Sequence, residues 1–242
     1  VAFSTFLAYR NRTATSFIAN LGLLSGLTSG NSKLNLLDSK PIAHLLTEYE
    51  AIVVPVNSKY TELPQLVDDL TKNNVNISFV GGPSNGTDNY FLNKFLKIIS
   101  VPRNKVTFQS TNSGYEVVKT LLSDKTKVGI SANGDFVSGV NAGKLRVLGI
   151  ASPTRLSWIK GKTLQSQNVD LVFGNWYGLM APSYLSDNDF NNLLRAIEVL
   201  HNSKYWNKVL NDNYWSDDFL YPDDFKSKIV QETQEIKEMA SQ

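Results

Sequence analysis

Between residues 51 and 151 the chain alternates short apolar runs with amphipathic segments, and no other feature constrains the fold as strongly. A short apolar run is typical of a buried strand, and apolar residues at helical spacing are typical of an amphipathic helix. Alternation of the two predicts an α/β fold with parallel strands joined by right-handed crossovers. The predicted strands are residues 51–56, 75–80, 105–108, 127–131 and 145–151, and the predicted helices are residues 63–70, 87–99 and 115–122.

After residue 152 the alternation stops, and a loop-rich stretch leads to three predicted helices. In the first helix, Ser186 stands three positions before Asp189, which is a capping-box pattern. Pro222 suits the first turn of the last helix. The three helices are predicted to start near residues 187, 203 and 222, and short apolar segments precede them at 171–173 and 177–181.

The composition excludes several classes of partner and cofactor. The 242 residues carry a net charge of only +2 and their lysines and arginines are scattered, so we predict no nucleic-acid partner. There is no cysteine, which excludes disulfides, thiolate metal sites and cysteine nucleophiles. No apolar stretch reaches the roughly 18 residues that a membrane span needs. Residues 1–13 also lack the basic start and cleavage pattern of a secretion signal.

The residues that could carry catalysis form no recognisable set. Only two histidines are present, which excludes a histidine-rich metal site. His44 lies in an apolar run and is expected to be structural, whereas His201 ends a predicted helix, where a positive charge complements the helix dipole. No G-x-S-x-G motif occurs, and no two carboxylates have a spacing that indicates an acid–base pair. We therefore predict no catalytic residue, no metal ligand and no cofactor, in a protein that is not an enzyme.

The stretch SFVGGPSNGTDNYFL, residues 78–92, is the most informative for function. A predicted strand stops at two glycines, a polar turn follows, and a predicted helix begins. Glycines let the backbone approach a ligand closely, and the N–H groups of a helix start attract an anion. The ordinary alternative is a strand-to-helix turn with a threonine cap, and the residues alone favour neither. The predicted ligand-binding residues here are Gly81, Gly82, Ser84, Asn85, Gly86, Thr87 and Asp88.

Two further polar loops are predicted to leave the sheet at the same edge. They are STNSG, residues 110–114, and SANGD, residues 131–135. The carboxyl ends of parallel strands meet at one edge, where open α/β sheets bind ligands, although each loop alone is also typical of a solvent-facing turn. Trp176 has two interpretations, a cleft wall or a core residue. These loops and the tryptophan add Ser110, Ser131, Asp135 and Trp176 to the predicted site.

Short motifs in a fixed order cover roughly residues 17–230. They are PIAHLL at 41–46, EYEAIVVP at 48–55, VGG at 80–82, GTD at 86–88, VGIS at 128–131, GDF at 134–136, AGKLR at 142–146, NW at 175–176 and GLMAP at 178–182. In this order they resemble the substrate-binding receptors of tripartite tricarboxylate transporters, the TctC or Bug family. Their order is more specific than any one of them.

The resemblance implies a two-lobed, periplasmic-binding-protein-like α/β fold in which each lobe is a mainly parallel sheet flanked by helices. Lobe one would comprise residues 1–57 and 148–242, without the family's usual N-terminal strand and ligand loop, and lobe two residues 58–147. The implied function is a periplasmic receptor that captures a small carboxylate, such as a tricarboxylate or dicarboxylate, between the lobes. The implied partners are this organic acid and the membrane transporter subunits to which the receptor delivers it.

Two other functions stay open. The first is a protein with the receptor fold that binds no ligand, which the departures from the family pattern at the N-terminus would explain. The second is a small-molecule hydrolase or transferase that uses Asp135 or Asp88 on a similar frame.

Overall fold

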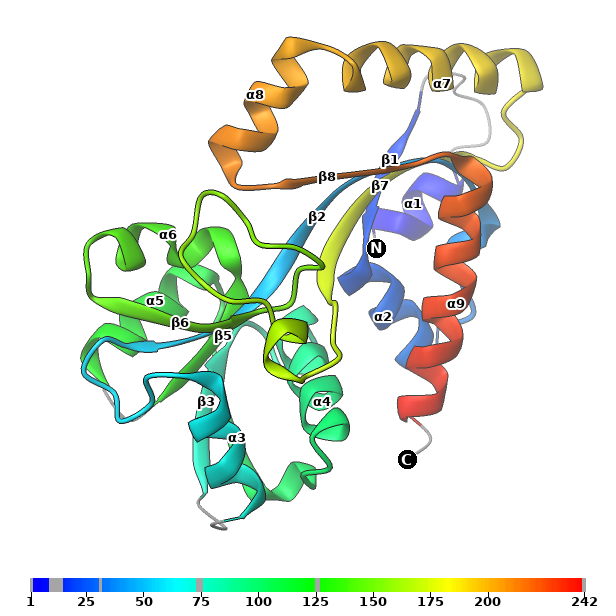
Figure 1. The fold of residues 1–242 in the computed structure, drawn as a ribbon. Helices are drawn as coiled ribbons and strands as arrows, with labels where there is room; N and C mark the ends of the chain where they lie inside the picture. Colours follow the sequence, from blue (N-terminus) through cyan, green and yellow to red (C-terminus); the bar gives the residue numbers. More distant parts are fainter. Residues whose placement is uncertain (1, 9–14, 31, 73–75, 125–126, 241–242) are drawn as a thin grey trace. The chain divides into compact units, whose positions relative to one another are not determined.

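The structure is a computed structural model that describes residues 2–8, 15–30, 32–72, 76–124 and 127–240. It is of the α/β class that the sequence predicts (Figure 1). The chain forms two compact units: unit 1 consists of Val1–Thr47 and Trp176–Gln242, and unit 2 of Glu48–Asn175. The predicted limits of the lobes lie at 57/58 and 147/148, so unit 2 contains the whole of the predicted second lobe and extends beyond it on both sides.

In unit 2, three of the five strands that the alternation predicts to be parallel are parallel, and the two at residues 51–56 and 145–151 are antiparallel. Strand β3 (Ile77–Gly81) pairs in parallel with β4 (Val106–Ser110) on one side and β5 (Val128–Ala132) on the other. The end of the long strand β2 (Ser39–Pro55) and strand β6 (Leu145–Ile150) complete the sheet with antiparallel pairs. The carboxyl ends of β3, β4 and β5 therefore lie at one edge.

Helices cover both faces of this sheet (Figure 1). The chain moves from β3 to β4 in one direction and returns from β4 to β5 in the other, so right-handed crossovers place the two connecting helices on opposite faces. The buried side chains of these two helices, at helical spacing, are Tyr90, Phe91, Leu92, Phe95, Leu96, Val117 and Leu121. The helices of unit 2 are α3 (Leu63–Thr71), α4 (Thr87–Ile98), α5 (Gly114–Ser123) and α6 (Asn133–Asn141).

The described strand pairs of unit 1 are antiparallel. Strand β1 (Phe17–Asn20) pairs with β7 (Gly174–Pro182), and β8 (Ser216–Leu220) pairs with the start of β2. The expectation of a mainly parallel sheet in each lobe is therefore wrong for these pairs, although the fold class itself is confirmed. Antiparallel partners need no helical crossover between them, so strand–helix alternation along the chain could not reveal this arrangement.

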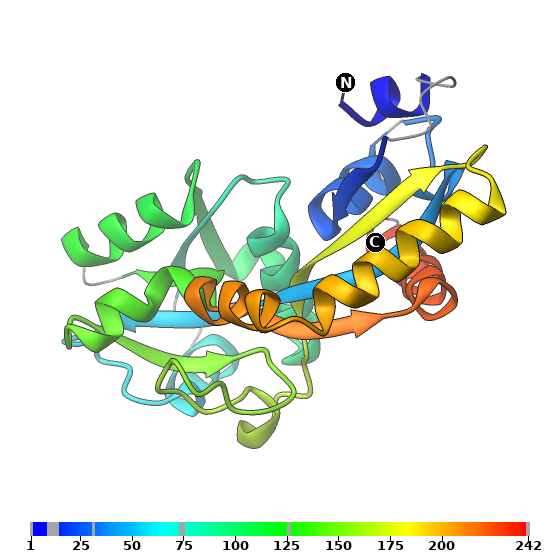
Figure 2. The ribbon, with the colours of Figure 1, turned by 90° about the horizontal axis from the view of Figure 1, so that it is seen from above.

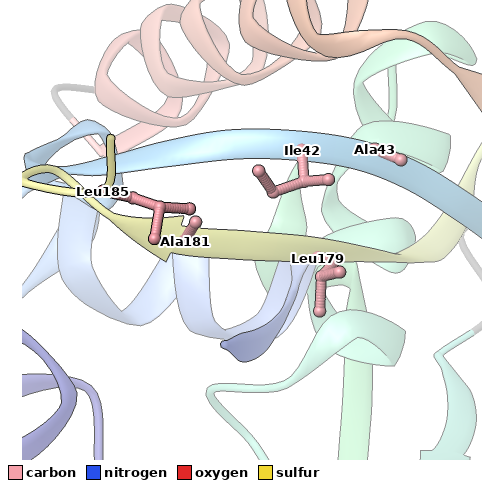
Figure 3. Packing of buried hydrophobic residues seen from close by; sticks show 5 residues of the cluster. All are labelled: Ile42, Ala43, Leu179, Ala181 and Leu185. Carbon is pink, nitrogen blue, oxygen red and sulfur yellow. The ribbon is translucent and has the colours of Figure 1, made fainter. Parts of the chain in front are cut away.

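The core of unit 1 lies where β2 and β7 run side by side (Figure 3). Ile42 and Ala43 of β2 pack with Leu179 and Ala181 of β7 and with Leu185. Helix α7 (Asp187–His201) packs Phe190, Leu193, Leu194 and Ile197 against this cluster, and in Figure 2 this yellow-orange helix lies beside the yellow strand β7. The other helices of unit 1 are α1 (Ala2–Ala8), α2 (Leu21–Ser29), α8 (Lys204–Asn213) and α9 (Pro222–Ala240).

The predicted cap of α7 is confirmed, because the Ser186 hydroxyl accepts the N–H of Asp189 at 3.1 Å. Part of the N-terminal segment that the sequence analysis singled out, residues 1 and 9–14, lies outside the described residues. None of the helices in the described parts of the chain has the length and apolar character needed to cross a membrane.

Candidate ligand-binding site

The three polar loops singled out in the sequence meet at the carboxyl edge of β3, β4 and β5, within unit 2. Thr111 ties the second loop to the first, because its N–H and its hydroxyl both donate to the carbonyl of Gly81, at 2.8 and 2.9 Å. The third loop touches the second, since a Cβ added to Gly114 would lie only 1.9 Å from Asp135 Oδ2. A glycine is therefore needed for Asp135 to lie against this backbone.

The first loop is closed by its own aspartate. The N–H of Gly82 donates to Asp88 Oδ2 at 2.7 Å, and the N–H of Gly86 donates to the carbonyl of Pro83 at 2.8 Å. The Asp88 carboxylate thus occupies a backbone donor that the sequence analysis assigned to a ligand. Helix α4 starts at Thr87 with Gly86 as its N-cap and without a side-chain cap bond, so the threonine cap of the ordinary alternative is not formed.

The remaining predicted residues of unit 2 differ in exposure. Ser84 and Asn85 are exposed on the turn, and Ser110 is exposed at the end of β4. Ser131 is buried at the end of β5, and its hydroxyl donates to Asp135 Oδ2 at 2.6 Å. The stretch expected to be a third loop is shorter than predicted, because α6 already begins at Asn133 and Asp135 lies in its first turn.

Trp176 lies in unit 1, in the core rather than on a surface. Its side chain is fully buried, its ring packs edge-on against Phe225 with centroids 5.3 Å apart, and its indole N–H donates to Glu232. Of the two interpretations that the sequence allows, the structure matches the core residue.

Sequence reasoning missed one residue of this edge, Glu50. It lies on β2 directly opposite Ala132 of β5, and it is only 1% exposed. Its Oε2 atom is buried and has no hydrogen-bond partner among the described residues. A buried, unsatisfied carboxyl oxygen costs about 1–3 kcal/mol or more. The sequence did hold a signal, because a glutamate stands directly before the run of apolar residues 51–56. A strand with two buried faces does not need such a charged residue.

The carboxyl groups of this edge raise one another's pKa. Burial raises the pKa of Glu50 well above its ordinary value, and the charges of Asp88, Asp135 and Glu48 add to the rise. Burial also raises the pKa of Asp88 to about 6, against the opposing effect of its hydrogen bond from Gly82. The pKa of Asp135 is raised by burial as well, and the Ser131 hydroxyl partly counteracts this. Burial therefore opposes ionisation at all three carboxyl groups of this edge.

Positive charge lies elsewhere on unit 2. The amine of Lys94 lies over the rings of Tyr90 and Phe173, 5.4 and 5.6 Å from their centroids. An open cavity of about 670 Å³ is lined by exposed side chains of Arg155, Lys160 and Lys162. This cavity is larger than the other hollows described on unit 2, but the predicted ligand-binding residues do not line it. Within the described ranges, no group of three or more His, Cys, Asp or Glu side chains is placed to hold a metal ion.

No protein-family model matches the chain, and no curated protein sequence matches it. Solved structures do match, and they define the class of fold as that of periplasmic solute-binding proteins. The chain superposes on a TctC solute-binding protein from Polaromonas with a TM-score of 0.81 and 16% identity, over 99% of this chain and 82% of that one. The resemblance inferred from the ordered motifs is therefore confirmed at the level of the fold.

Two similar structures contain a bound ligand. MatC from Rhodopseudomonas palustris, with bound malate, matches with a TM-score of 0.77 and 13% identity, over 99% of this chain and 83% of that one. A second R. palustris protein, with adipate, matches with a TM-score of 0.77 and 14% identity, over 99% of this chain and 82% of that one. At these identities the comparison establishes a shared fold, and function has to be argued from the residues of this chain.

Proposed function

We propose that the protein is an extracytoplasmic solute-binding receptor that captures a small organic acid. The observation that carries the proposal is the match of 99% of the chain, at a TM-score of 0.81, to a protein described as a solute-binding protein. Proteins of the same fold hold malate and adipate, which are both dicarboxylates. A periplasmic location and delivery of the acid to membrane transporter subunits are parts of the same proposal.

The start of α4 and the end of β5 are the parts of unit 2 that we assign to the ligand. Gly86 caps α4 without a side-chain bond, and the first-turn N–H groups of a helix favour a carboxylate. Ser84, Thr87 and Ser131 add hydroxyl groups around the same edge. Gly81 and Gly82 are assigned to the close approach of the backbone to the ligand. The N–H of Gly82 is not available to the ligand while it donates to the Asp88 carboxylate.

The same hydrogen bond favours a second candidate, a receptor fold that binds no ligand. If Asp88 permanently takes the place of a ligand carboxylate at the N–H of Gly82, the chain itself stabilises the turn and no ligand is needed there. This candidate predicts that no small acid stabilises the protein.

A thermal-shift screen followed by calorimetry separates the two candidates. Dicarboxylates of four to six carbons, citrate, aromatic acids and acidic amino acids form the panel. We expect at least one acid to bind, and Thr87→Val to weaken it about tenfold, the equivalent of about 1.4 kcal/mol, because one hydrogen bond to a charged group is lost. Thr71→Val is the matched control, since Thr71 is an exposed threonine of α3 in the same unit. Absence of binding across the panel would leave the ligand-free candidate.

A further inference from the structure

The open cavity of about 670 Å³ on unit 2 has a base and walls of its own. Leu148 of β6 and Ile159 line it and are only 2% and 4% exposed, so the base of the cavity is apolar. Its walls come from the stretch 155–162, from residues 61–62 before α3 and from Asn141 at the end of α6. The volume lies within the range of about 300–1,000 Å³ that is typical of pockets for small molecules.

Strand β6 holds the backbone of the main wall in place. The N–H of Ile150 donates to the carbonyl of Lys162 at 3.0 Å, and the N–H of Leu164 donates to the carbonyl of Ile150 at 2.8 Å. Gly161 lies directly against the strand, because a Cβ added there would be 2.8 Å from Val147 Cγ1. The wall is therefore tied to the sheet, and the cavity beside it is a built feature of the fold.

Trp158 gives the cavity an anchored aromatic side chain. It lines the cavity and is partly buried, and its indole N–H donates to Asn133 Oδ1 at 2.7 Å. The Asn133 side chain is fully buried and donates in turn to the carbonyl of Tyr49 at 3.0 Å. An aromatic lining residue that is fixed in this way can pack on an apolar or aromatic part of a ligand.

The charge of the lining is unbalanced. Three cationic side chains, Arg155, Lys160 and Lys162, line the cavity against one acidic side chain, Glu62. The whole chain carries 24 basic and 22 acidic residues, so this ratio is a local excess of positive charge. In the part of the chain that the structure describes, the side chains of Arg155 and Lys160 have no partner, and the amine of Lys162 lies 3.9 Å from Glu62. Two cations are therefore free to receive an anion.

We propose that this cavity is a binding site for an organic anion that carries two or more negative charges and an apolar or aromatic part. Arg155 and Lys160 receive the negative charge, and Trp158 with the apolar base receives the rest of the ligand. Phosphate and carboxylate groups share this chemistry, and the test distinguishes them. The inference goes beyond the proposed function and does not depend on it, because none of the residues assigned to the captured acid lines the cavity.

Four probes, titrated calorimetrically at pH 8, test which parts of the ligand matter. Phenyl phosphate and isophthalate combine an aromatic ring with two negative charges, whereas inorganic phosphate lacks the ring and benzyl alcohol lacks the charge. We expect phenyl phosphate or isophthalate to bind about tenfold more tightly than inorganic phosphate and benzyl alcohol, because only these two use both the cations and the aromatic wall. The tighter of the two identifies the anionic group. Equally weak binding of all four probes overturns the inference.

Two substitutions locate the bound anion. Arg155→Gln and Lys160→Gln each remove a positive charge from an exposed lining side chain, and each should weaken the tightest probe about tenfold, because a charge-assisted hydrogen bond is lost. Lys119→Gln is the matched control, since Lys119 is an exposed lysine of α5 in the same unit that lines none of the cavities described on it. Equal affinity in wild type and both cavity variants overturns the inference.

The Thr87→Val variant separates this inference from the proposed function. Thr87 belongs to the proposed receptor site and does not line the cavity, so its substitution should leave the affinity of the probe unchanged. A probe that is weakened by Thr87→Val and not by Arg155→Gln is bound at the receptor site, which overturns the inference and supports the proposed function. A probe with the reverse pattern supports the cavity site even if no acid of the thermal-shift panel binds.

Discussion

Strand β2 carries a buried histidine in unit 1 and a buried glutamate in unit 2, and the two differ in their surroundings. His44 is fully buried in unit 1, and Glu50 is 1% exposed in unit 2. His44 lies 3.4 Å from the Thr47 hydroxyl and 3.9 Å from Asp218, and its ring packs against Phe225 at 5.6 Å. The surroundings of Glu50 are less favourable, because the charges that act on it most are negative.

The two side chains differ in the charge around them. A neutral histidine among aromatic rings, with a hydroxyl and a carboxylate nearby, fits the structural role that the sequence predicts for His44, although its buried Nδ1 atom has no hydrogen-bond partner among the described residues. A buried carboxyl group that is crowded by like charges destabilises the unit that contains it. Each of the two side chains therefore has one buried atom without a partner, and the negative charge around Glu50 distinguishes them.

The largest expected effect comes from removing the packing around His44. Trp176→Ala should lower the free energy of unfolding by about 3–5 kcal/mol, because it deletes a fully buried aromatic side chain that packs on Phe225 and His44. Urea denaturation measures the change. Tyr205→Ala, at a residue of unit 1 that is 70% exposed, is the control and should change stability by no more than about 0.5 kcal/mol. A cost for Trp176→Ala as small as that of the control would contradict the assignment of Trp176 to the core.

The second largest expected effect is a loss of folding stability in acid that is caused by His44. Burial lowers its pKa from 6.5 to about 4, and the nearby Asp218 carboxylate only partly opposes this shift. Between these two pH values the unfolded chain binds a proton that the folded protein does not. The free energy of unfolding is therefore undiminished by His44 above pH 6.5 and decreases as the pH falls toward 4. The loss amounts to about 3 kcal/mol.

The measurement is the free energy of unfolding as a function of pH in wild type and His44→Gln. The variant should lack this contribution between pH 4 and 6.5, while above pH 7.5 the two curves should run parallel. Parallel curves over the whole range would mean that His44 does not carry the acid sensitivity.

The carboxyl groups of unit 2 should make stability depend on pH in the opposite direction from His44. Because the pKa of Asp88 is raised from 3.8 to about 6, its ionised form destabilises the folded protein above pH 6, and this penalty disappears as the pH falls below 3.8. Asp88→Asn should therefore stabilise the ligand-free protein at pH 8 by about 1–3 kcal/mol and have little effect at pH 3.5. Denaturant unfolding at the two pH values measures this. A destabilised Asp88→Asn at pH 8 would mean that the charge supports the fold and would weaken the contrast with His44.

The sequence predicted unit 2 better than unit 1, for a physical reason. In unit 2 the strands β2 to β5 are each followed by a helix, so both periodicities occur in turn, and the predicted helix 63–70 corresponds to α3 at Leu63–Thr71. In unit 1 the antiparallel partners β2 and β8 are far apart in the chain, and the first part of β2 mixes polar residues with apolar ones. The local pattern of apolar and polar residues carries no information about strand pairs that are so far apart in the chain.

The meeting of the three polar stretches at one sheet edge was predictable from the sequence, and the hydrogen bonds within them were not. The carboxyl-edge rule for parallel sheets was sufficient to bring the loops at Gly81, Gly114 and Ser131 together. The bond from Gly82 to Asp88 depends on a side chain folding back over its own turn, and the surroundings of Glu50 depend on which residues lie across the sheet from it.

Helix α6 was missed for a related reason. Asn133 and Gly134 are poor helix formers, so the sequence favours a loop at this position. The Asn133 side chain donates to the carbonyl of Tyr49 at 3.0 Å and accepts the indole N–H of Trp158 at 2.7 Å. These contacts with residues far away in the chain override the local preference.

The smallest expected effect compares one helix cap from each unit. Ser186 caps α7 of unit 1 with a bond of 3.1 Å to the N–H of Asp189, and its hydroxyl donates to the Asp189 carboxylate at 2.8 Å. Ser113 caps α5 of unit 2 with a single bond of 3.4 Å to the N–H of Glu116, near the limit for a hydrogen bond. Ser186→Ala should therefore cost about 1 kcal/mol and Ser113→Ala about half of that.

Both costs are measured as shifts of the urea midpoint at constant m-value. Because Ser113 lies beside Gly114, which contacts Asp135, a larger loss in Ser113→Ala than in Ser186→Ala would show that this cap also holds the carboxyl edge in place. That result would extend the part of unit 2 that we assign to the ligand to the loop that supports it.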